Sequence, residues 1–196
     1  MSVMAKAVIF DFDNTLMLLG VNWNRVKADI VRLAKAERVP IDEGQHIIFL
    51  SNLLSDTPAR KDAIDGLYLK YEEECIRQRR YTAFPEMLSL VRRLKAAGYS
   101  LAIASGNHTI SIMELLSESG LLDCFTAVCG RDLVKNNKPA ADQVHFVLGK
   151  LGVAPEDALF VGDSVNDEAA ARDSGVRFFK VTNHNADAER LRKLLL

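Results

Sequence analysis

Residues 8–17 read VIFDFDNTLM, and this stretch decides the fold. Its first residues are apolar and mostly β-branched or aromatic, which is typical of a strand that is buried on both faces. The strand ends in two aspartates, Asp11 and Asp13, that are one residue apart. Carboxylates this close repel each other, and burying either one without a partner costs several kcal/mol. We therefore expect the rest of the chain to show what compensates for this cost.

The composition is that of an ordinary globular protein. The chain has 196 residues, of which 48% are hydrophobic and 26% charged, and this is enough for one core with a small accessory unit. Its 25 basic and 26 acidic residues give a net charge of −1, so charge offers no case for a nucleic-acid or membrane partner. No apolar run approaches the ~20 residues needed to cross a bilayer, and the first residues lack the layout of a signal peptide. The 3 cysteines have no C-x-x-C spacing, which argues against disulfides and zinc and predicts a cytoplasmic location.

Four further short apolar runs resemble the first strand. With residues 5–10, the predicted strands are 100–104, 127–129, 158–161 and 176–181. The helical patterns between them are 85–97, 109–119, 139–151 and 165–174, and a glycine follows each one. Strands that alternate with helices imply right-handed crossovers and a parallel sheet. The sequence therefore predicts an α/β fold with a doubly wound, Rossmann-like parallel sheet.

One segment interrupts this alternation. Residues 17–82 show no convincing strand and instead contain three helical patterns. Asp42 is a candidate N-cap of the second pattern, and Thr57, which precedes a proline, is a candidate N-cap of the third. The segment is too long for an ordinary crossover between strands. We predict a core domain formed by 1–16 and 83–196, with an inserted helical domain at 17–82.

Polar side chains follow three of the predicted strands, and a lysine precedes a predicted helix. In chain order the set is Asp11, Asp13, Thr15, Ser105, Gly106, Asn107, Lys138, Asp163 and Asp167. In open parallel sheets, ligands bind beyond the carboxyl ends of the strands, so we expect these residues to share one edge.

This set suits phosphoryl transfer. Asp11, Asp13 and Asp163 offer the hard oxygen ligands that Mg²⁺ prefers. Ser105 and the amides that follow it can bind phosphate oxygens, and Lys138 can neutralise both carboxylate and phosphoryl charge. Phosphoryl transfer depends mainly on positioning and charge neutralisation, and these residues supply both.

Four short motifs carry a resemblance to a known family. In chain order they are DFDNT at 11–15, ASGN at 104–107, KP at 138–139 and GDSVND at 162–167. They resemble the four ordered motifs of the haloacid dehalogenase superfamily, most closely its branch of phosphoglycolate phosphatases and β-phosphoglucomutases. The resemblance covers nearly the whole chain, because that branch carries a helical C1-type cap after the first motif. It implies a phosphatase, since an acid at Asp13 suits a phosphoester and the dehalogenases lack one there.

The resemblance also implies a role for each reactive residue. Asp11 would be the nucleophile that forms an aspartyl-phosphate, and Asp13 would protonate the leaving oxygen and then activate water. Lys138 would bridge Asp11 and the phosphoryl oxygens. The phosphate-binding set would be Thr15 (through the loop geometry), Ser105, Gly106, Asn107 and Lys138, and the Mg²⁺ set would be Asp11, Asp13, Asp163 and, indirectly or through water, Asp167. Departures from the common pattern at 14, 18–19 and 141 leave these residues in place.

Candidate specificity residues lie in the predicted insertion and beside the second motif. Arg60 and Lys61 follow the turn between the second and third predicted helices, where a cation can bind a second anionic group of the substrate. The alternative is that both are solvated residues at a helix start. His108 is close to Ser105 and is expected to line the cleft, whereas Trp23 is expected to pack inside the cap.

Several activities stay open. The leading prediction is Mg²⁺-dependent hydrolysis of a small phosphorylated metabolite, and a phosphomutase of the β-phosphoglucomutase type would need the same aspartyl-phosphate. A phosphonate hydrolase would need a cap lysine that forms a Schiff base, for which Lys27, Lys35, Lys61 and Lys70 are present. A phospho-accepting signalling module also combines acids, Mg²⁺ and a lysine, but such modules are shorter and lack a helical insertion.

Overall fold

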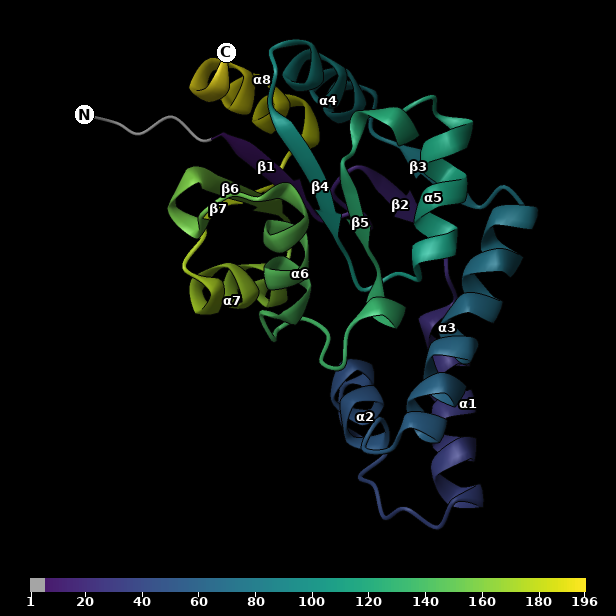
Figure 1. Ribbon diagram of the computed structural model, residues 1–196. Helices are drawn as coiled ribbons and strands as arrows, with labels where there is room; N and C mark the ends of the chain where they lie inside the picture. Colours follow the sequence, from purple (N-terminus) through teal and green to yellow (C-terminus); the bar gives the residue numbers. More distant parts are fainter. Residues whose placement is uncertain (1–5) are drawn as a thin grey trace.

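A parallel sheet of five strands forms the centre of the computed structural model, which describes residues 6–196 (Figure 1). The strands are β1 (Ala7–Phe10), β4 (Ser100–Ala104), β5 (Ala127–Cys129), β6 (Ala158–Gly162) and β7 (Arg177–Lys180). Their order in the sheet is β5-β4-β1-β6-β7, and every neighbouring pair is parallel. The predicted α/β fold with a doubly wound parallel sheet is confirmed. Residues 1–5, which belong to the predicted core domain and include the first residue of the predicted first strand, lie outside the described residues.

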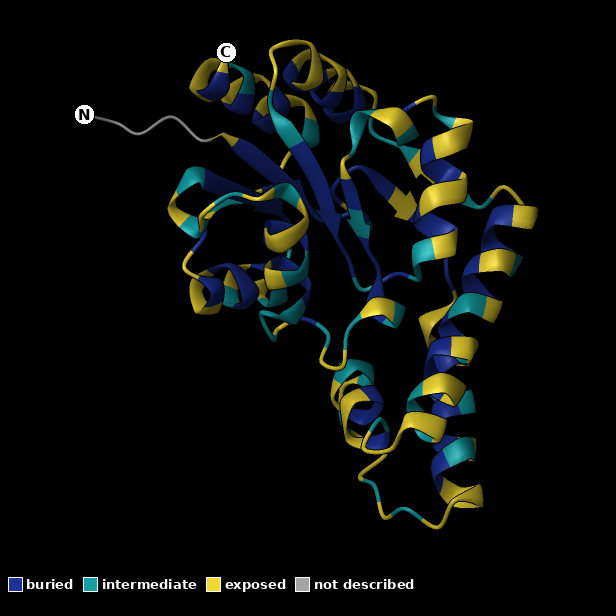
Figure 2. Ribbon diagram, in the orientation of Figure 1, coloured by how far each residue is buried: buried dark blue, intermediate teal, exposed yellow. Residues whose placement is uncertain are grey.

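Side chains of the central strand alternate between two hydrophobic cores, one on each face of the sheet. The helices that cover the faces are α4 (Pro85–Ala96), α5 (Thr109–Glu118), α6 (Asp142–Leu151), α7 (Val165–Ser174) and α8 (His184–Leu195). Ala7 and Ile9 pack in a core shared with α6 and α7. Val8 and Phe10 pack in a core shared with α4, α5 and α8. All four residues are fully buried, and each large side chain contributes about 1.5–3 kcal/mol by its burial. The ribbon of β1 accordingly has the colour of buried residues in Figure 2.

Three further helices project from one side of the sheet and are called the helical unit below (Figure 1). They are α1 (Trp23–Ala36), α2 (Ile47–Leu54) and α3 (Pro58–Arg77). The side chains of Asn22 and Thr57 accept backbone hydrogen bonds from the first turns of α1 and α3, so they act as N-caps. Ile30, Leu50 and Ile64, one from each helix, are fully buried in the same apolar cluster. This packing stabilises the unit, because each helix buries its apolar face in this cluster.

A second sheet of two strands joins the two ends of the helical unit. β2 (Met17–Leu19) pairs antiparallel with β3 (Tyr81–Ala83). The prediction that 17–82 contains no strand is therefore wrong. Three residues are too few for an apolar period to appear, and the pairing joins segments that are far apart in the sequence. The pair holds the entry and exit of the unit side by side, and the domain boundaries after 16 and 82 stay a prediction.

Two helices begin later than predicted. The carboxylate of Asp42 accepts a hydrogen bond from the Gly44 backbone at 2.9 Å in a turn, and His46 caps α2 instead. α6 begins at Asp142, after the cis peptide bond that precedes Pro139. Short 3₁₀ helices complete the connections: η1 (Leu122–Cys124), η2 (Arg131–Leu133) and η3 (Pro155–Asp157). Within residues 6–196, no helix has both the length and the apolar character that crossing a membrane requires.

Candidate active site

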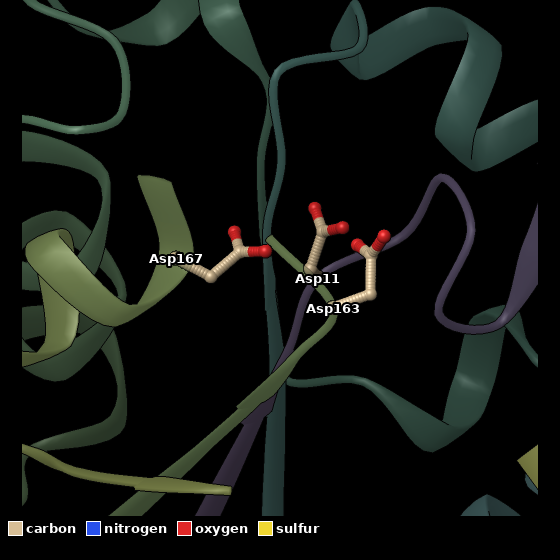
Figure 3. Close-up of side chains that lie close together, drawn as sticks. All are labelled: Asp11, Asp163 and Asp167. Carbon is tan, nitrogen blue, oxygen red and sulfur yellow. The ribbon is translucent and has the colours of Figure 1, made fainter. Parts of the chain in front are cut away.

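Carboxylates at the ends of β1 and β6 and at the start of α7 lie close together, and two of them contact the ammonium group of Lys138. Asp11 directly follows β1, Asp163 directly follows β6, and Asp167 lies in the first turn of α7 (Figure 3). Lys138 Nζ lies 2.6 Å from Asp11 Oδ1 and 2.5 Å from Asp167 Oδ1. All three paired side chains are buried. Loss of one partner would therefore leave an uncompensated charge away from water.

Burial and this shared ion pair shift the pKa values of the site in different directions. Burial raises the pKa of Asp11 above its usual range, and the nearby Lys138 ammonium offsets the rise only partly. Burial alone would raise the pKa of Asp167, but Lys138 and the hydrogen bonds from Ser164 lower it. Burial alone would lower the pKa of Lys138, but the two carboxylates raise it, so this lysine stays charged. Burial raises the pKa of Asp13 to about 6.

The carboxylates of the site can hold a divalent cation. Asp11, Asp163 and Asp167 each place one carboxylate oxygen within 4.8 Å of the others. Both oxygens of Asp167 are engaged, Oδ1 by Lys138 and Oδ2 by the backbone N–H and hydroxyl of Ser164. Asp11 Oδ2 has only a long contact of 3.4 Å with the Thr15 hydroxyl, and Asp163 accepts a side-chain hydrogen bond from the described residues at Oδ2 alone, so these two residues are better placed to bind a cation directly. Hard carboxylate oxygens are the ligands that Mg²⁺ prefers. The donor set fits a magnesium-type ion.

The turn after β1 positions three consecutive polar residues. Asn14 has a φ of 56°, in the left-handed region that asparagine adopts more readily than most residues. Its Nδ2 donates to Asp163 Oδ2 at 2.6 Å, which connects the ends of β1 and β6. The hydroxyl of Thr15 is fully buried and lies 3.4 Å from Asp11 Oδ2. Asp13 Oδ1 accepts a hydrogen bond of 2.8 Å from the backbone of β2, so Asp13 is held independently of Lys138.

The loop after β4 carries Ser105, Gly106 and Asn107, and the hydroxyl of Ser105 lies 3.0 Å from Asn107 Oδ1. Gln143 of α6 connects this loop to the loop of Lys138. Its Nε2 donates to the Ser105 carbonyl oxygen at 2.5 Å, and its Oε1 accepts from the Lys138 backbone N–H at 3.3 Å. Sequence reasoning missed Gln143, because a glutamine in the first turn of a helix usually faces solvent, whereas this one is fully buried.

A cavity of about 390 Å³ lies between this edge of the sheet and the helical unit. The predicted residues that line it are Asp11, Asp13, Ser105, Gly106, Asn107, Lys138 and Asp163. From the side of the helical unit, its lining residues are Trp23, His46, Ile47, Ile48, Ser51, Asn52 and Tyr68. Trp23 packs on Tyr68, with ring centroids 5.8 Å apart, but it also faces the cavity, so the expectation that it serves packing alone is incomplete.

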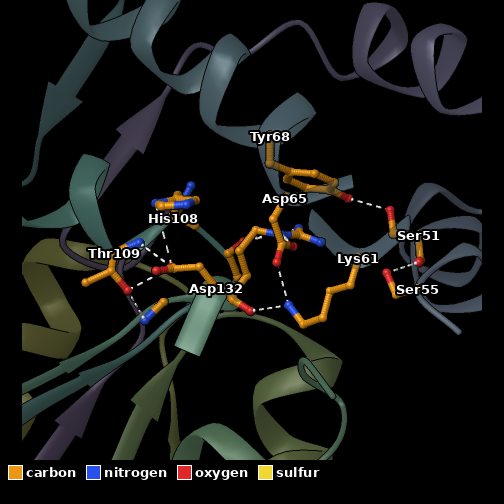
Figure 4. Close-up of polar contacts among 12 residues, drawn as sticks. Ser51, Ser55, Lys61, Asp65, Tyr68, His108, Thr109 and Asp132 are labelled. Carbon is orange, nitrogen blue, oxygen red and sulfur yellow. Dashed lines mark hydrogen bonds and ion pairs between the residues drawn. The ribbon is translucent and has the colours of Figure 1, made fainter. Parts of the chain in front are cut away.

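Arg131 of η2 is a cavity residue that sequence reasoning missed. Its side chain is buried, its guanidinium carbon lies 3.4 Å from the centre of the Tyr68 ring, and its Nε donates to Asp65 Oδ1 at 2.7 Å. Lys61 also pairs with Asp65, at 2.5 Å, so these three charged groups keep one net positive charge (Figure 4). Among the described residues that line the cavity, Arg131 and Lys138 are the two with a permanent positive charge. No local motif marks Arg131, because its partners lie in a different part of the chain.

Arg60, Lys61 and His108, the predicted specificity residues, do not line the cavity. Arg60 Nη1 donates to both carboxylate oxygens of Asp56, at 2.7 and 2.8 Å. Lys61 Nζ donates to the Arg131 carbonyl oxygen at 3.0 Å, so it supports the cavity wall from behind. His108 acts as the N-cap of α5 and is not among the residues that line the cavity. Its ring lies beside Asp132 instead (Figure 4). The expectation that His108 lines the cleft is therefore wrong, and the contacts of Arg60 and Lys61 with a substrate stay a prediction.

One buried carboxylate of the helical unit contacts the loop after β4. Glu72 of α3 is fully buried, and its Oε1 accepts from Asn107 Nδ2 at 3.0 Å. Its Oε2 accepts from the backbone N–H of His108, also at 3.0 Å. Burial raises the pKa of Glu72 to about 7, although these hydrogen bonds lower it in part. No sequence motif marked this residue.

The fold and the site define a class of protein: an α/β protein with clustered acids and a lysine at the carboxyl edge of a parallel sheet, and a helical unit over the cavity. Residues 5–175 match the family described as haloacid dehalogenase-like hydrolase. The chain belongs to this family of hydrolases. The superfamily and the hydrolytic enzyme class that the four motifs predicted are thereby confirmed.

Curated relatives also match the predicted branch. The phosphoglycolate phosphatase of Aliivibrio fischeri is 27% identical over 190 residues, which cover 90% of this chain and 84% of that protein. The phosphoglycolate phosphatase of Salmonella typhi is 34% identical over 122 residues, which cover 61% of this chain and 48% of that protein. The match to the enzyme of Salmonella choleraesuis spans 60% of that protein's length.

Solved structures share the whole architecture. A putative phosphoglycolate phosphatase from Lactobacillus plantarum superposes with a TM-score of 0.68 at 20% identity, over 97% of this chain and 99% of that chain. A haloacid dehalogenase phosphatase from Thermococcus onnurineus superposes with a TM-score of 0.63 at 24% identity, over 97% of each chain. At these identities the likeness shows the fold alone.

Proposed function

We propose that this protein is a Mg²⁺-dependent hydrolase of small phosphomonoesters that works through an aspartyl-phosphate. The observation that carries the proposal is the 2.6 Å contact between Lys138 Nζ and Asp11 Oδ1, in a cavity that Asp13 and Ser105 also line. A buried lysine beside a carboxylate can bind a phosphoryl group and neutralise its charge during transfer. The phosphoglycolate phosphatases among the relatives support this activity.

The reaction has two steps. In the first, the Asp11 carboxylate attacks phosphorus, the bond between phosphorus and the ester oxygen breaks, and Asp13 gives its proton to the leaving oxygen. In the second, Asp13 takes a proton from water, the water oxygen attacks phosphorus, and inorganic phosphate leaves as the Asp11 carboxylate is restored. Lys138 and Ser105 bind the phosphoryl oxygens in both steps.

Asp11, Asp163 and the backbone carbonyl of Asp13 would hold the Mg²⁺. Asp167 would act indirectly, since Lys138 and Ser164 engage its two carboxylate oxygens at 2.5–2.9 Å, whereas Asp11 Oδ2 has only the 3.4 Å contact with Thr15. When bound, Mg²⁺ supplies positive charge that Lys138 alone does not provide. Thr15, which does not line the cavity, supports the Asp11 carboxylate through its buried hydroxyl.

Cavity size and charge support a small acidic substrate. A volume of about 390 Å³ suits a small metabolite, and the predicted insertion at 17–82, which contains the helical unit, serves as the cap over it. Arg131 favours a substrate with a second anionic group, such as the carboxylate of phosphoglycolate. Asp65 pairs with both Lys61 and Arg131, so Lys61 offsets the charge of Asp65 and leaves the positive charge of Arg131 for the substrate. The free thiols of the three cysteines agree with a reducing, cytoplasmic location.

Phosphate release from a panel of phosphorylated metabolites tests the proposal. We expect release by the wild-type protein with Mg²⁺, and loss of release with EDTA or after Asp11→Asn. Asp62→Asn, on an exposed turn of α3, is the matched control and should leave the rate unchanged. Release that survives both Asp11→Asn and EDTA would refute the mechanism. Return of the phosphoryl group to a second substrate position, without release, would indicate a phosphomutase.

A further inference from the structure

A row of side chains on α3 faces the core. Lys61, Asp65, Tyr68 and Glu72 follow one another at the three- and four-residue spacing that places side chains on one face of a helix. The first three, which Figure 4 labels, each contact Arg131 of η2. Glu72 lies further along the same face and reaches the loop after β4. The helical unit therefore contacts the core both at the cavity wall and at the proposed phosphate-binding loop.

The contact of Glu72 continues to Ser105 through one intervening side chain. Glu72 Oε1 accepts from Asn107 Nδ2 at 3.0 Å, and Asn107 Oδ1 lies 3.0 Å from Ser105 Oγ. An ionised carboxylate can only accept hydrogen bonds, so it holds the amide with its nitrogen toward Glu72 and its oxygen toward Ser105. The three side chains are at most 3% exposed, so water does not readily replace any of these contacts.

We propose that Glu72 is a positioning residue for phosphate binding, acting through Asn107 to hold in place the loop that carries Ser105. The single hydroxyl proton of Ser105, which goes to Asn107 Oδ1 in this structure, turns to a phosphoryl oxygen when phosphate binds. Because Glu72 belongs to the helical unit, the same contact couples the position of this unit to the affinity of the loop for phosphate. Coupling of this kind is reciprocal, so bound phosphate also stabilises the contact between α3 and the core. The inference rests on the proposed function, which makes phosphate the ligand of the Ser105 loop. Glu72 itself does not line the cavity.

Three variants of α3 separate positioning from general destabilisation. Glu72→Met removes both acceptors and should weaken the binding of inorganic phosphate about tenfold, equal to about 1.4 kcal/mol. Glu72→Gln should restore affinity to within about twofold of the wild type, because the new amide can still accept from His108 and donate to a rotated Asn107 amide. Glu73→Gln changes an exposed carboxylate next to Glu72 and should have no effect.

Isothermal titration of the Mg²⁺-loaded protein with inorganic phosphate at pH 8, above the pKa of Glu72, measures these affinities without reference to turnover. Amide hydrogen exchange gives a second readout: phosphate should slow exchange in α3 around Glu72 in the wild type and fail to do so in Glu72→Met. A merely structural role for Glu72 would lower the thermal midpoint but leave the phosphate Kd unchanged. That result, or a wild type that binds no phosphate, would overturn the inference.

The inference and the proposed function can fail separately. If Glu72→Met binds phosphate more weakly than the wild type, but the wild type releases no phosphate from any ester, the inference stands and the proposed function fails. If the wild type hydrolyses esters and Glu72→Met keeps the phosphate Kd of the wild type, the proposed function stands and the inference fails. Should Glu72→Met not fold, Asn107→Ala interrupts the same path at its middle, and an unchanged phosphate Kd in that variant also overturns the inference.

Discussion

The buried carboxylate of Glu72 should make stability fall as the pH rises toward neutrality. Burial raises the pKa of Glu72 from 4.5 to about 7. Between these two values the folded protein binds more protons than the unfolded chain, so the free energy of unfolding decreases with increasing pH. At one pKa unit per about 1.4 kcal/mol, the full difference is about 3 kcal/mol, of which about 2–3 kcal/mol develops between about pH 5 and pH 8. Glu72→Gln has no such proton to lose and should lack this dependence.

Urea unfolding of the wild type and Glu72→Gln, run in parallel across this pH range, measures the effect. The stability of the Gln variant relative to the wild type should rise by about 2–3 kcal/mol from about pH 5 to pH 8. Titration of the other buried carboxylates, such as Asp11 and Asp13, occurs in both proteins and cancels in the difference. A difference that does not change with pH would refute the reasoning, because it would mean that the folded protein accepts the charge of Glu72 without cost.

Other predictions concern the cavity and its supporting loops. Arg131→Met should raise the KM for phosphoglycolate by at least about tenfold. The KM for ethyl phosphate, which carries a methyl group in place of the carboxylate, should stay nearly unchanged. Equal effects on the two esters would exclude the proposed role of Arg131 in binding the carboxylate. Lys138→Met should abolish phosphate release and lower the free energy of unfolding by about 3–5 kcal/mol at pH 8, since it leaves two buried carboxylates unpaired. Urea unfolding at pH 5 should show a smaller loss, because protonation removes the unpaired charge, and a loss independent of pH would contradict the pairing. Gly130→Ala should destabilise the fold by about 1–3 kcal/mol, because a Cβ there would lie 2.3 Å from the Thr109 backbone nitrogen. Gly149→Ala, in an open part of α6, is the matched control and should stabilise by up to about 1 kcal/mol; equal thermal midpoints would refute the steric argument.

The sequence could predict the residues at the carboxyl edge of the sheet because each follows a recognisable strand or precedes a recognisable helix. Apolar runs identify β1 and β6, and parallel topology then brings Asp11 and Asp163 together without any knowledge of packing. Lys138 follows from the same logic, although the helix behind it begins only at Asp142. Local patterns were sufficient here, since the strand ends converge by topology.

The contacts between the helical unit and the core could not be predicted in this way. Lys61, Asp65 and Glu72 are charged residues of a kind that usually faces solvent on a helix, yet each binds a group of the core. Which face of α3 is buried depends on how the unit sits on the core, and the helical period alone carries no information about that placement. Arg131 was missed for the same reason, because its partners Asp65 and Tyr68 are in the helical unit.

The two aspartates after β1 receive different forms of compensation, and the strand that sequence reasoning missed provides one of them. Lys138 contacts Asp11 and Asp167 at hydrogen-bond distance, so its charge serves the proposed nucleophile. Asp13 instead accepts a hydrogen bond of 2.8 Å from the backbone N–H of Leu19 in β2. Because β2 pairs with β3 at the exit of the helical unit, the same small sheet that attaches this unit also orients the proposed general acid. A disturbance of the β2–β3 pair should therefore change both the position of the cap and the proton transfer that Asp13 performs.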